Sequence, residues 1–285
     1  MKLTNYFYIL LMSAPLALFS KPTTLVFDLG YTLVKPNKQA LSSEIGVIDY
    51  GGYSIFDGKD SDDMKSCVFD ILSLIEGMQS CPECDIVRAD DARPFPLALV
   101  NWQCGFIKPK IIHEEALEYV EELNDLGYFV SPREYRLVIN ALRIMLDPET
   151  LANSMKPIRK ALKLVKECAE QTDENGEPLY ELYILSNWDP TSFEIFTRSE
   201  KMQELLSYFK PENIVISGRI NKIKPHKDIY QYLLSTYKIK PQECIFIDDQ
   251  EENILGAQSC GITAIQLQDK NYKKLREELE ELRGN

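Results

Sequence analysis

Short apolar runs that end in polar or acidic residues constrain the fold of this chain more than any other feature. Residues 24–28 (TLVFD) end in Asp28 and lead to Gly30, and residues 182–185 (LYIL) lead directly to Ser186. Three similar runs follow, at residues 213–217, 244–249 and 263–267. Strands of parallel sheets have this pattern, because helices cover both of their faces. We therefore predict five buried strands.

Helical segments separate these runs. Residues 227–237 and 251–259 have helical character, and Gly261 ends the second segment. Strands that alternate with helices form βαβ units with right-handed crossovers. We therefore predict an α/β fold with a Rossmann-like parallel sheet, whose active site forms at the carboxyl ends of the strands.

The middle of the chain has a different pattern. Ser131 and Glu134 form a capping box around Pro132, and an apolar stripe at helical spacing follows over residues 135–146. Further stripes occur over residues 116–123 and 158–169, helix is also expected over residues 62–78, and loops are predicted around Gly51-Gly52 and over residues 83–96. These patterns predict a mostly helical insertion.

We expect the catalytic core to comprise residues 21–35 and 181–285, and the helical cap to comprise residues 36–180. Residues 1–20 stand apart, because the uncharged apolar run 6–19 follows a basic start. Such a run is typical of a signal peptide and is short for a stable membrane span. We expect export to the periplasm or the medium, with a cytoplasmic location or an N-terminal membrane anchor as alternatives.

The acidic composition argues against one class of partner. The chain has 32 Lys and Arg residues against 44 Asp and Glu residues, which gives a net charge of −12. This charge repels phosphate backbones, so we expect no nucleic-acid partner. The sequence does not indicate an oligomeric state.

Cysteine spacing leaves several alternatives open. Cys81 and Cys84 have the spacing of a metal or redox site, but no second pair of this kind follows. A zinc site would need Cys67 or Cys104 to lie close to this pair in space, and in an exported chain the four cysteines could form one or two disulfides. Unpaired thiols are the third alternative.

Candidate site residues lie at the ends of the predicted strands. Asp28 on a glycine-containing turn is a candidate nucleophile or metal ligand. Ser186 and Asn187 offer a hydroxyl and an amide to a phosphoryl oxygen, and Lys224 offers a positive charge to an anionic substrate. Each residue alone is commonly a turn cap or a solvated surface residue, but their positions at successive strand ends argue for a shared site.

The adjacent pair Asp248-Asp249 adds a requirement for a cation. Two neighbouring carboxylates at a buried strand end repel each other, and oxygen-only ligands suit Mg²⁺. We therefore expect a magnesium site at this position.

The order of these residues resembles the four motifs of haloacid dehalogenase superfamily hydrolases, with residues 28–33 as the first motif. More narrowly, LSN at 185–187, KP at 224–225 and IFIDDQEENILGAQSCGI at 245–262 resemble the glucose-1-phosphate phosphatase-like and epoxide-hydrolase N-terminal-like branch. The resemblance covers residues 23–35 and roughly 180–270, and leaves out the insertion.

The resemblance implies a Mg²⁺-dependent phosphatase that acts on a small phosphate ester. In that mechanism Asp28 attacks phosphorus and forms an aspartyl-phosphate, while Ser186 and Lys224 bind the phosphoryl group that is transferred. The ligands implied for Mg²⁺ are the carboxylates of Asp28, Asp248 and Asp249 and the Gly30 carbonyl.

Gly30 departs from the common pattern of the superfamily, in which an Asp at this position is the general acid and base. Dehalogenases of the superfamily also lack this Asp, but they use no Mg²⁺, and Asp248-Asp249 would repel a carboxylate substrate. We therefore favour a phosphatase over a haloacid dehalogenase. A catalytically silent binding protein that retains the fold is the other alternative.

Overall fold

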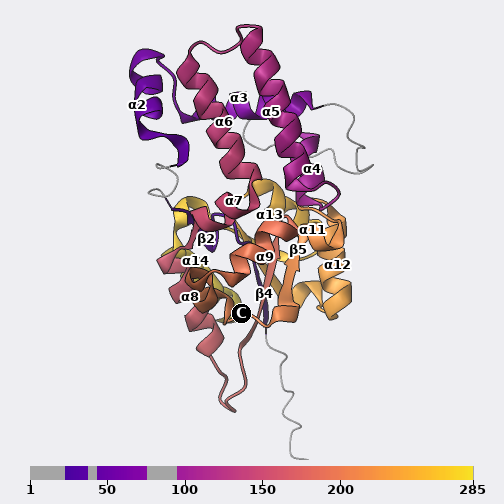
Figure 1. Ribbon diagram of the computed structural model, residues 1–285. Coiled ribbons are helices and arrows are strands. Elements are labelled where there is room, and N and C mark those ends of the chain that lie inside the picture. Colours follow the sequence, from indigo (N-terminus) through magenta and orange to yellow (C-terminus); the bar gives the residue numbers. More distant parts are fainter. Residues whose placement is uncertain (1–22, 38–43, 76–94, 285) are drawn as a thin grey trace, which may run out of the picture.

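The computed structural model describes residues 23–37, 44–75 and 95–284 (Figure 1). The expected signal peptide at residues 1–20 lies outside the described residues, as do Cys81 and Cys84, so export and the state of these cysteines stay predictions. Cys67 and Cys104 are described, and both are buried among apolar side chains. Within the described ranges, no helix combines the length and the apolar character needed to cross a membrane.

Five parallel strands form the central sheet, in the order β5-β4-β1-β6-β7. Their bounds are β1 Thr23–Phe27, β4 Tyr180–Ser186, β5 Ile214–Ile216, β6 Cys244–Asp248 and β7 Thr263–Gln266. In the centre, Phe27 of β1 lies opposite Ile184 of β4 and Ile247 of β6. The predicted α/β class and the parallel sheet are confirmed.

Helices cover both faces of the sheet. Successive residues of a strand point to opposite faces, so they contact different sets of helices. Leu25 and Phe27 pack with the helices of one face, which are α8 Arg159–Glu170, α9 Pro190–Arg198, α10 Glu200–Leu206 and α14 Tyr272–Gly284. Val26 packs with the helices of the other face, α12 Lys227–Tyr237 and α13 Glu251–Gln258. Both faces are thus buried, which explains the continuous apolar runs of the strands.

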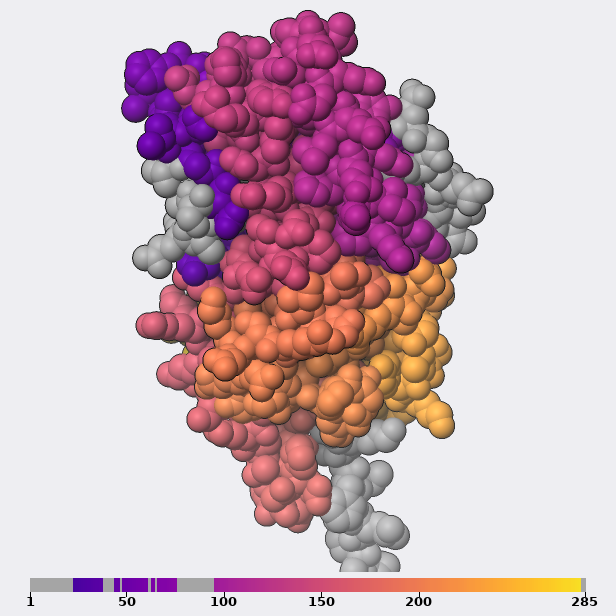
Figure 2. All heavy atoms as spheres, viewed as in Figure 1, coloured from indigo at the N-terminus to yellow at the C-terminus, as the bar shows by residue number. Residues whose placement is uncertain are grey.

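A helical cap lies over the core (Figures 1 and 2). Its helices are α2 Val47–Phe56, α3 Ser61–Leu74, α4 Leu97–Gln103, α5 Pro109–Asp125, α6 Pro132–Leu146 and α7 Pro148–Ser154. The cap has its own apolar cluster, in which Ile71, Val120 and Leu142 are fully buried. The predicted capping box is confirmed, because the Ser131 hydroxyl accepts a hydrogen bond from the backbone N–H of Glu134 at 3.2 Å.

The chain leaves and re-enters the core through one short antiparallel pair. Strand β2 (Val34–Pro36) pairs with β3 (Met155–Pro157). Helix α8 follows β3 and buries Leu164 and Val165 in the cluster of the sheet. We expected the cap to extend to residue 180; because α8 packs on the sheet, we propose to place the boundary at β3 instead.

The loop predicted around Gly51 and Gly52 is wrong, since both residues lie inside helix α2. Glycine is unfavourable in helices, which explains the prediction. At Gly52 the reason for glycine is tertiary: an added Cβ would lie 2.5 Å from Nε of Arg133 on α6. The missing side chain lets the two helices approach closely.

Cap and core are joined where α4 meets the short helix α11 (Ser217–Ile220). The Ser217 hydroxyl donates to the carbonyl oxygen of Gln103 at 2.6 Å, and Asn221 Nδ2 donates to the carbonyl oxygen of Cys104 at 2.8 Å. The next residue, Gly105, has a φ of 75°, and a Cβ there would lie 2.2 Å from the Gly218 carbonyl oxygen. Residue 105 therefore has no room for a side chain.

We predict that Gly105→Ala lowers the free energy of unfolding by about 3 kcal/mol, because it adds a backbone clash to an unfavourable left-handed conformation. Gly127→Ala is the matched control, since Gly127 has a φ of 72° but no atom within 4 Å of an added Cβ. The control should lose only about 1 kcal/mol. Urea unfolding of both variants measures the difference, and equal losses would contradict the close contact between cap and core.

Candidate active site

The carboxyl ends of three neighbouring strands bring the predicted site residues together. Asp28 follows β1, Ser186 ends β4 and Asp248 ends β6. The Ser186 hydroxyl donates to Asp28 Oδ1 at 2.9 Å. Because β1 pairs with both β4 and β6, the local pattern of each strand end is sufficient to place these groups side by side.

Lys224 lies between two of the carboxylates, although it comes from a loop. Its Nζ lies 2.7 Å from Asp28 Oδ1 and 2.6 Å from Asp248 Oδ2, and the residue is only 2% exposed. Asn253 Nδ2 also donates to Asp248 Oδ2, at 3.0 Å. The lysine is thus a buried counter-ion for both aspartates.

Asn187 fixes the backbone of Lys224. Its Nδ2 donates to the Lys224 carbonyl oxygen, its Oδ1 accepts from the Lys224 N–H, and both distances are 2.9 Å. The sequence suggested Asn187 as a substrate-binding residue; because its amide makes this paired contact, we propose that it positions Lys224.

Burial sets the ionisation of the carboxylates. It raises the pKa of Asp28 to about 6, although the Lys224 charge opposes this shift. Burial also raises the pKa of Asp249 to about 7, with a further increase from the nearby charges of Asp28 and Asp248. Burial alone would lower the pKa of Lys224, but Asp248 and Asp28 outweigh it and hold the pKa above its usual value. The lysine is therefore charged, and the acidic cluster has excess negative charge at neutral pH.

The acidic cluster fits a divalent cation. Asp28, Asp248 and Asp249 each offer a carboxylate oxygen, and these atoms lie within 4.8 Å of one another. Asp249 Oδ1 is shielded from solvent and has no hydrogen-bond partner among the described residues. A buried oxygen without a donor is costly, and hard oxygen ligands suit Mg²⁺. The Gly30 carbonyl accepts from the Thr32 N–H at 2.6 Å, so its role as a ligand stays a prediction.

We predict that Mg²⁺ raises the melting temperature of the protein at pH 7.5. At about 100 times its Kd, a ligand of the folded state adds about 2.7 kcal/mol, which corresponds to roughly 4–5 °C for a chain of this size. Asp249→Asn should lose most of this shift, while Glu251→Gln, an exposed residue in the first turn of α13, should retain it. Equal shifts in both variants would exclude Asp249 as a ligand.

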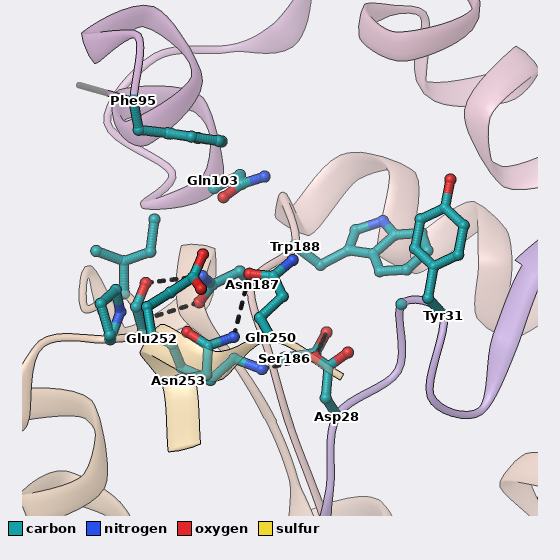
Figure 3. A pocket seen from close by; sticks show the side chains of 14 residues that line it. Asp28, Tyr31, Phe95, Gln103, Ser186, Asn187, Trp188, Gln250, Glu252 and Asn253 are labelled. Atoms are coloured by element: carbon teal, nitrogen blue, oxygen red, sulfur yellow. Dashed lines mark hydrogen bonds and ion pairs between the residues drawn. The ribbon is translucent and has the colours of Figure 1, made fainter. Parts of the chain in front are cut away.

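A cavity of about 200 Å³ lies above these groups, between core and cap (Figure 3). Tyr31, Trp188 and Glu252 line it from the core, and Phe95 and Gln103 line it from the cap. None of these five residues is a candidate site residue from the sequence alone. Only Tyr31 had a local signal, because it follows Gly30; the others are brought to the cavity by the packing of the cap.

Comparison with known proteins finds a family similarity over part of the chain. Residues 146–267 match the family model described as haloacid dehalogenase-like hydrolase. This range includes Ser186, Lys224 and Asp248-Asp249, whereas Asp28 lies before it.

Bifunctional epoxide hydrolase 2 of Rattus norvegicus is 33% identical over 101 residues, which are 35% of this chain and 18% of that protein. The corresponding protein of Mus musculus is 31% identical over 101 residues, with the same coverage. The matched region thus spans about a fifth of these relatives.

Solved structures of low sequence identity were also found. A HAD family enzyme from Bacteroides thetaiotaomicron has a TM-score of 0.48 at 17% identity, covering 86% of this chain and 93% of that chain. The L-2-haloacid dehalogenase from Xanthobacter autotrophicus has a TM-score of 0.47 at 14% identity, covering 86% and 77%. The family match over residues 146–267 contains Ser186, Lys224 and the Asp248-Asp249 pair, and this part of the chain is similar to haloacid dehalogenase-like hydrolases.

Proposed function

We propose that this hydrolase is a Mg²⁺-dependent phosphatase that cleaves a small phosphate monoester through an aspartyl-phosphate on Asp28. The arrangement around Asp28 carries the proposal. Ser186 and Lys224 both donate to Oδ1, and no donor from the described residues contacts Oδ2. Asp28 therefore has one fixed oxygen and one oxygen for attack, which is what a carboxylate nucleophile requires.

In the first step, Asp28 Oδ2 forms a bond to phosphorus, and the bond between phosphorus and the leaving-group oxygen breaks. The leaving group takes a proton from solvent, because residue 30 offers no acid. In the second step, water attacks phosphorus and gives up a proton to solvent, the bond between phosphorus and Asp28 breaks, and phosphate is released. Ser186 and Lys224 can donate hydrogen bonds to the phosphoryl oxygens in both steps, and such preorganised donors stabilise developing negative charge.

Asp28, Asp248 and Asp249 would hold the magnesium ion. When bound, it would offset the negative charge of the carboxylates and of the phosphoryl group. Lys224 remains charged beside Asp28 and Asp248 and contributes the fixed positive charge of the protein itself. Together these charges make an acidic site compatible with an anionic substrate.

The direct test is release of phosphate from 4-nitrophenyl phosphate with Mg²⁺, compared with the same assay in EDTA. We expect turnover with Mg²⁺ and none with EDTA. Absence of turnover with Mg²⁺ would favour the silent binding protein. Release of chloride from 2-chloropropionate in EDTA would favour a dehalogenase.

A further inference from the structure

Three aromatic side chains from different parts of the chain line the cavity above Asp28 (Figure 3). Tyr31 follows the nucleophile, Trp188 follows β4, and Phe95 precedes α4 of the cap. Aromatic rings offer flat apolar faces, which favour planar or apolar ligand groups over strongly hydrated ones. The volume of about 200 Å³ is below the roughly 300–1,000 Å³ of sites for drug-sized ligands, so the ligand is small.

The charges of this cavity are unusual for a site that receives an anion. The charged residues among its described lining are Asp28, Lys224 and Glu252. Lys224 already contacts two carboxylates, and Glu252 makes no ion pair with the described residues. Lys270 packs on the Tyr31 ring, with Nζ 5.1 Å from the ring centroid, but does not line the cavity. Beyond the catalytic groups, the described residues of the lining thus present a negative charge and no positive one.

Tyr31 has a backbone conformation that its side chain does not favour. Its φ is 55°, in the left-handed region, where a bulky residue is an outlier. Burial does not compensate for this strain, because the residue is 49% exposed at the cavity. Strained residues of this kind cluster at ligand sites, where the geometry of the side chain is used.

We propose that this cavity is a leaving-group subsite that accepts planar or apolar groups without negative charge, with Tyr31 as a wall and Glu252 as the group that rejects anions. The substrates are accordingly small phosphate monoesters whose leaving group is neutral or cationic. This inference rests on the proposed phosphatase function and adds its substrate class.

Three probes of similar size test the charge preference with Mg²⁺ present: phenyl phosphate, 4-carboxyphenyl phosphate and 4-(aminomethyl)phenyl phosphate. We expect kcat/KM for the carboxyl probe to be about tenfold below that for phenyl phosphate, because like charges repel strongly in a partly desolvated cavity. The aminomethyl probe should be cleaved at least as well as phenyl phosphate. Equal kcat/KM values for all three probes would overturn the subsite and leave the phosphatase function intact. Absence of turnover of every probe would overturn the phosphatase function itself.

Glu252→Gln and the matched control Glu251→Gln test whether the discrimination against the carboxyl probe comes from the charge of Glu252. Both glutamates lie in the first turn of α13, so their effects on the helix are alike, but only Glu252 lines the cavity. The phenyl-to-carboxyl ratio of kcat/KM should fall to about threefold or less in Glu252→Gln and stay near tenfold in Glu251→Gln. An unchanged ratio in Glu252→Gln would overturn its role.

Tyr31→Gly tests the aromatic wall while removing the backbone strain. We expect KM for phenyl phosphate to rise about fivefold, kcat to change less than twofold, and the melting temperature to be unchanged or higher. A lower melting temperature with a proportional loss of kcat would show a structural role and overturn the inference for Tyr31. An unchanged KM would also overturn it.

Discussion

Replacement of Asp28 by Asn is expected to lower phosphate release by at least about 10³-fold. The amide cannot form the acyl-phosphate, and removal of a nucleophile typically eliminates most of the catalysis that its partners support. The fold should persist, because Asn retains an acceptor for Ser186 and Lys224 keeps its contact with Asp248. Turnover of 4-nitrophenyl phosphate and thermal melting of the same preparation measure the two effects.

Asp173→Asn is the matched control for this substitution. Asp173 lies in an exposed turn that precedes β4, at the opposite end of this strand from Ser186, and should leave turnover unchanged. If Asp28→Asn kept more than about a tenth of the wild-type rate, Asp28 would not be the nucleophile. The donors at its Oδ1 would then serve only to hold a metal ligand in place.

Gly30→Asp is expected to increase the turnover of alkyl phosphates by about 10²-fold. General acid catalysis typically contributes about 10²–10⁴-fold, and an alkoxide leaving group needs the proton more than a phenolate does. The structure gives room for the change: φ of Gly30 lies outside the left-handed region, and an added Cβ would lie 3.7 Å from Asp28 Oδ2, an ordinary contact. The new carboxyl would therefore lie next to the nucleophile.

The measurement is the ratio of alkyl to aryl turnover in the wild type, in Gly30→Asp and in the control Gly30→Ala. The ratio should rise only in Gly30→Asp, because alanine adds the same Cβ without the acid. A wild type that cleaves both classes equally fast would show that another group donates the proton. A folded Gly30→Asp with an unchanged ratio would contradict the role of a missing acid.

The sequence determined the sheet and the positions of its reactive groups. Apolar runs that end in Asp28, Ser186 and Asp248-Asp249 predicted strands, and the carboxyl ends of parallel strands necessarily meet at one edge. Helix starts such as Ser131 were also predictable, because a capping box acts within four residues. These features depend on neighbours in the chain, so a single sequence contains them.

The tertiary structure decided what depends on distant contacts. Lys224 comes from a loop, and only the fold shows that its Nζ joins Asp28 to Asp248 while Asn187 holds its backbone. Phe95 and Gln103 reach the cavity because the cap packs on α11, a contact between residues more than a hundred positions apart. The local sequence therefore determined where reactive groups occur, and the packing of cap on core decided which of them face a substrate.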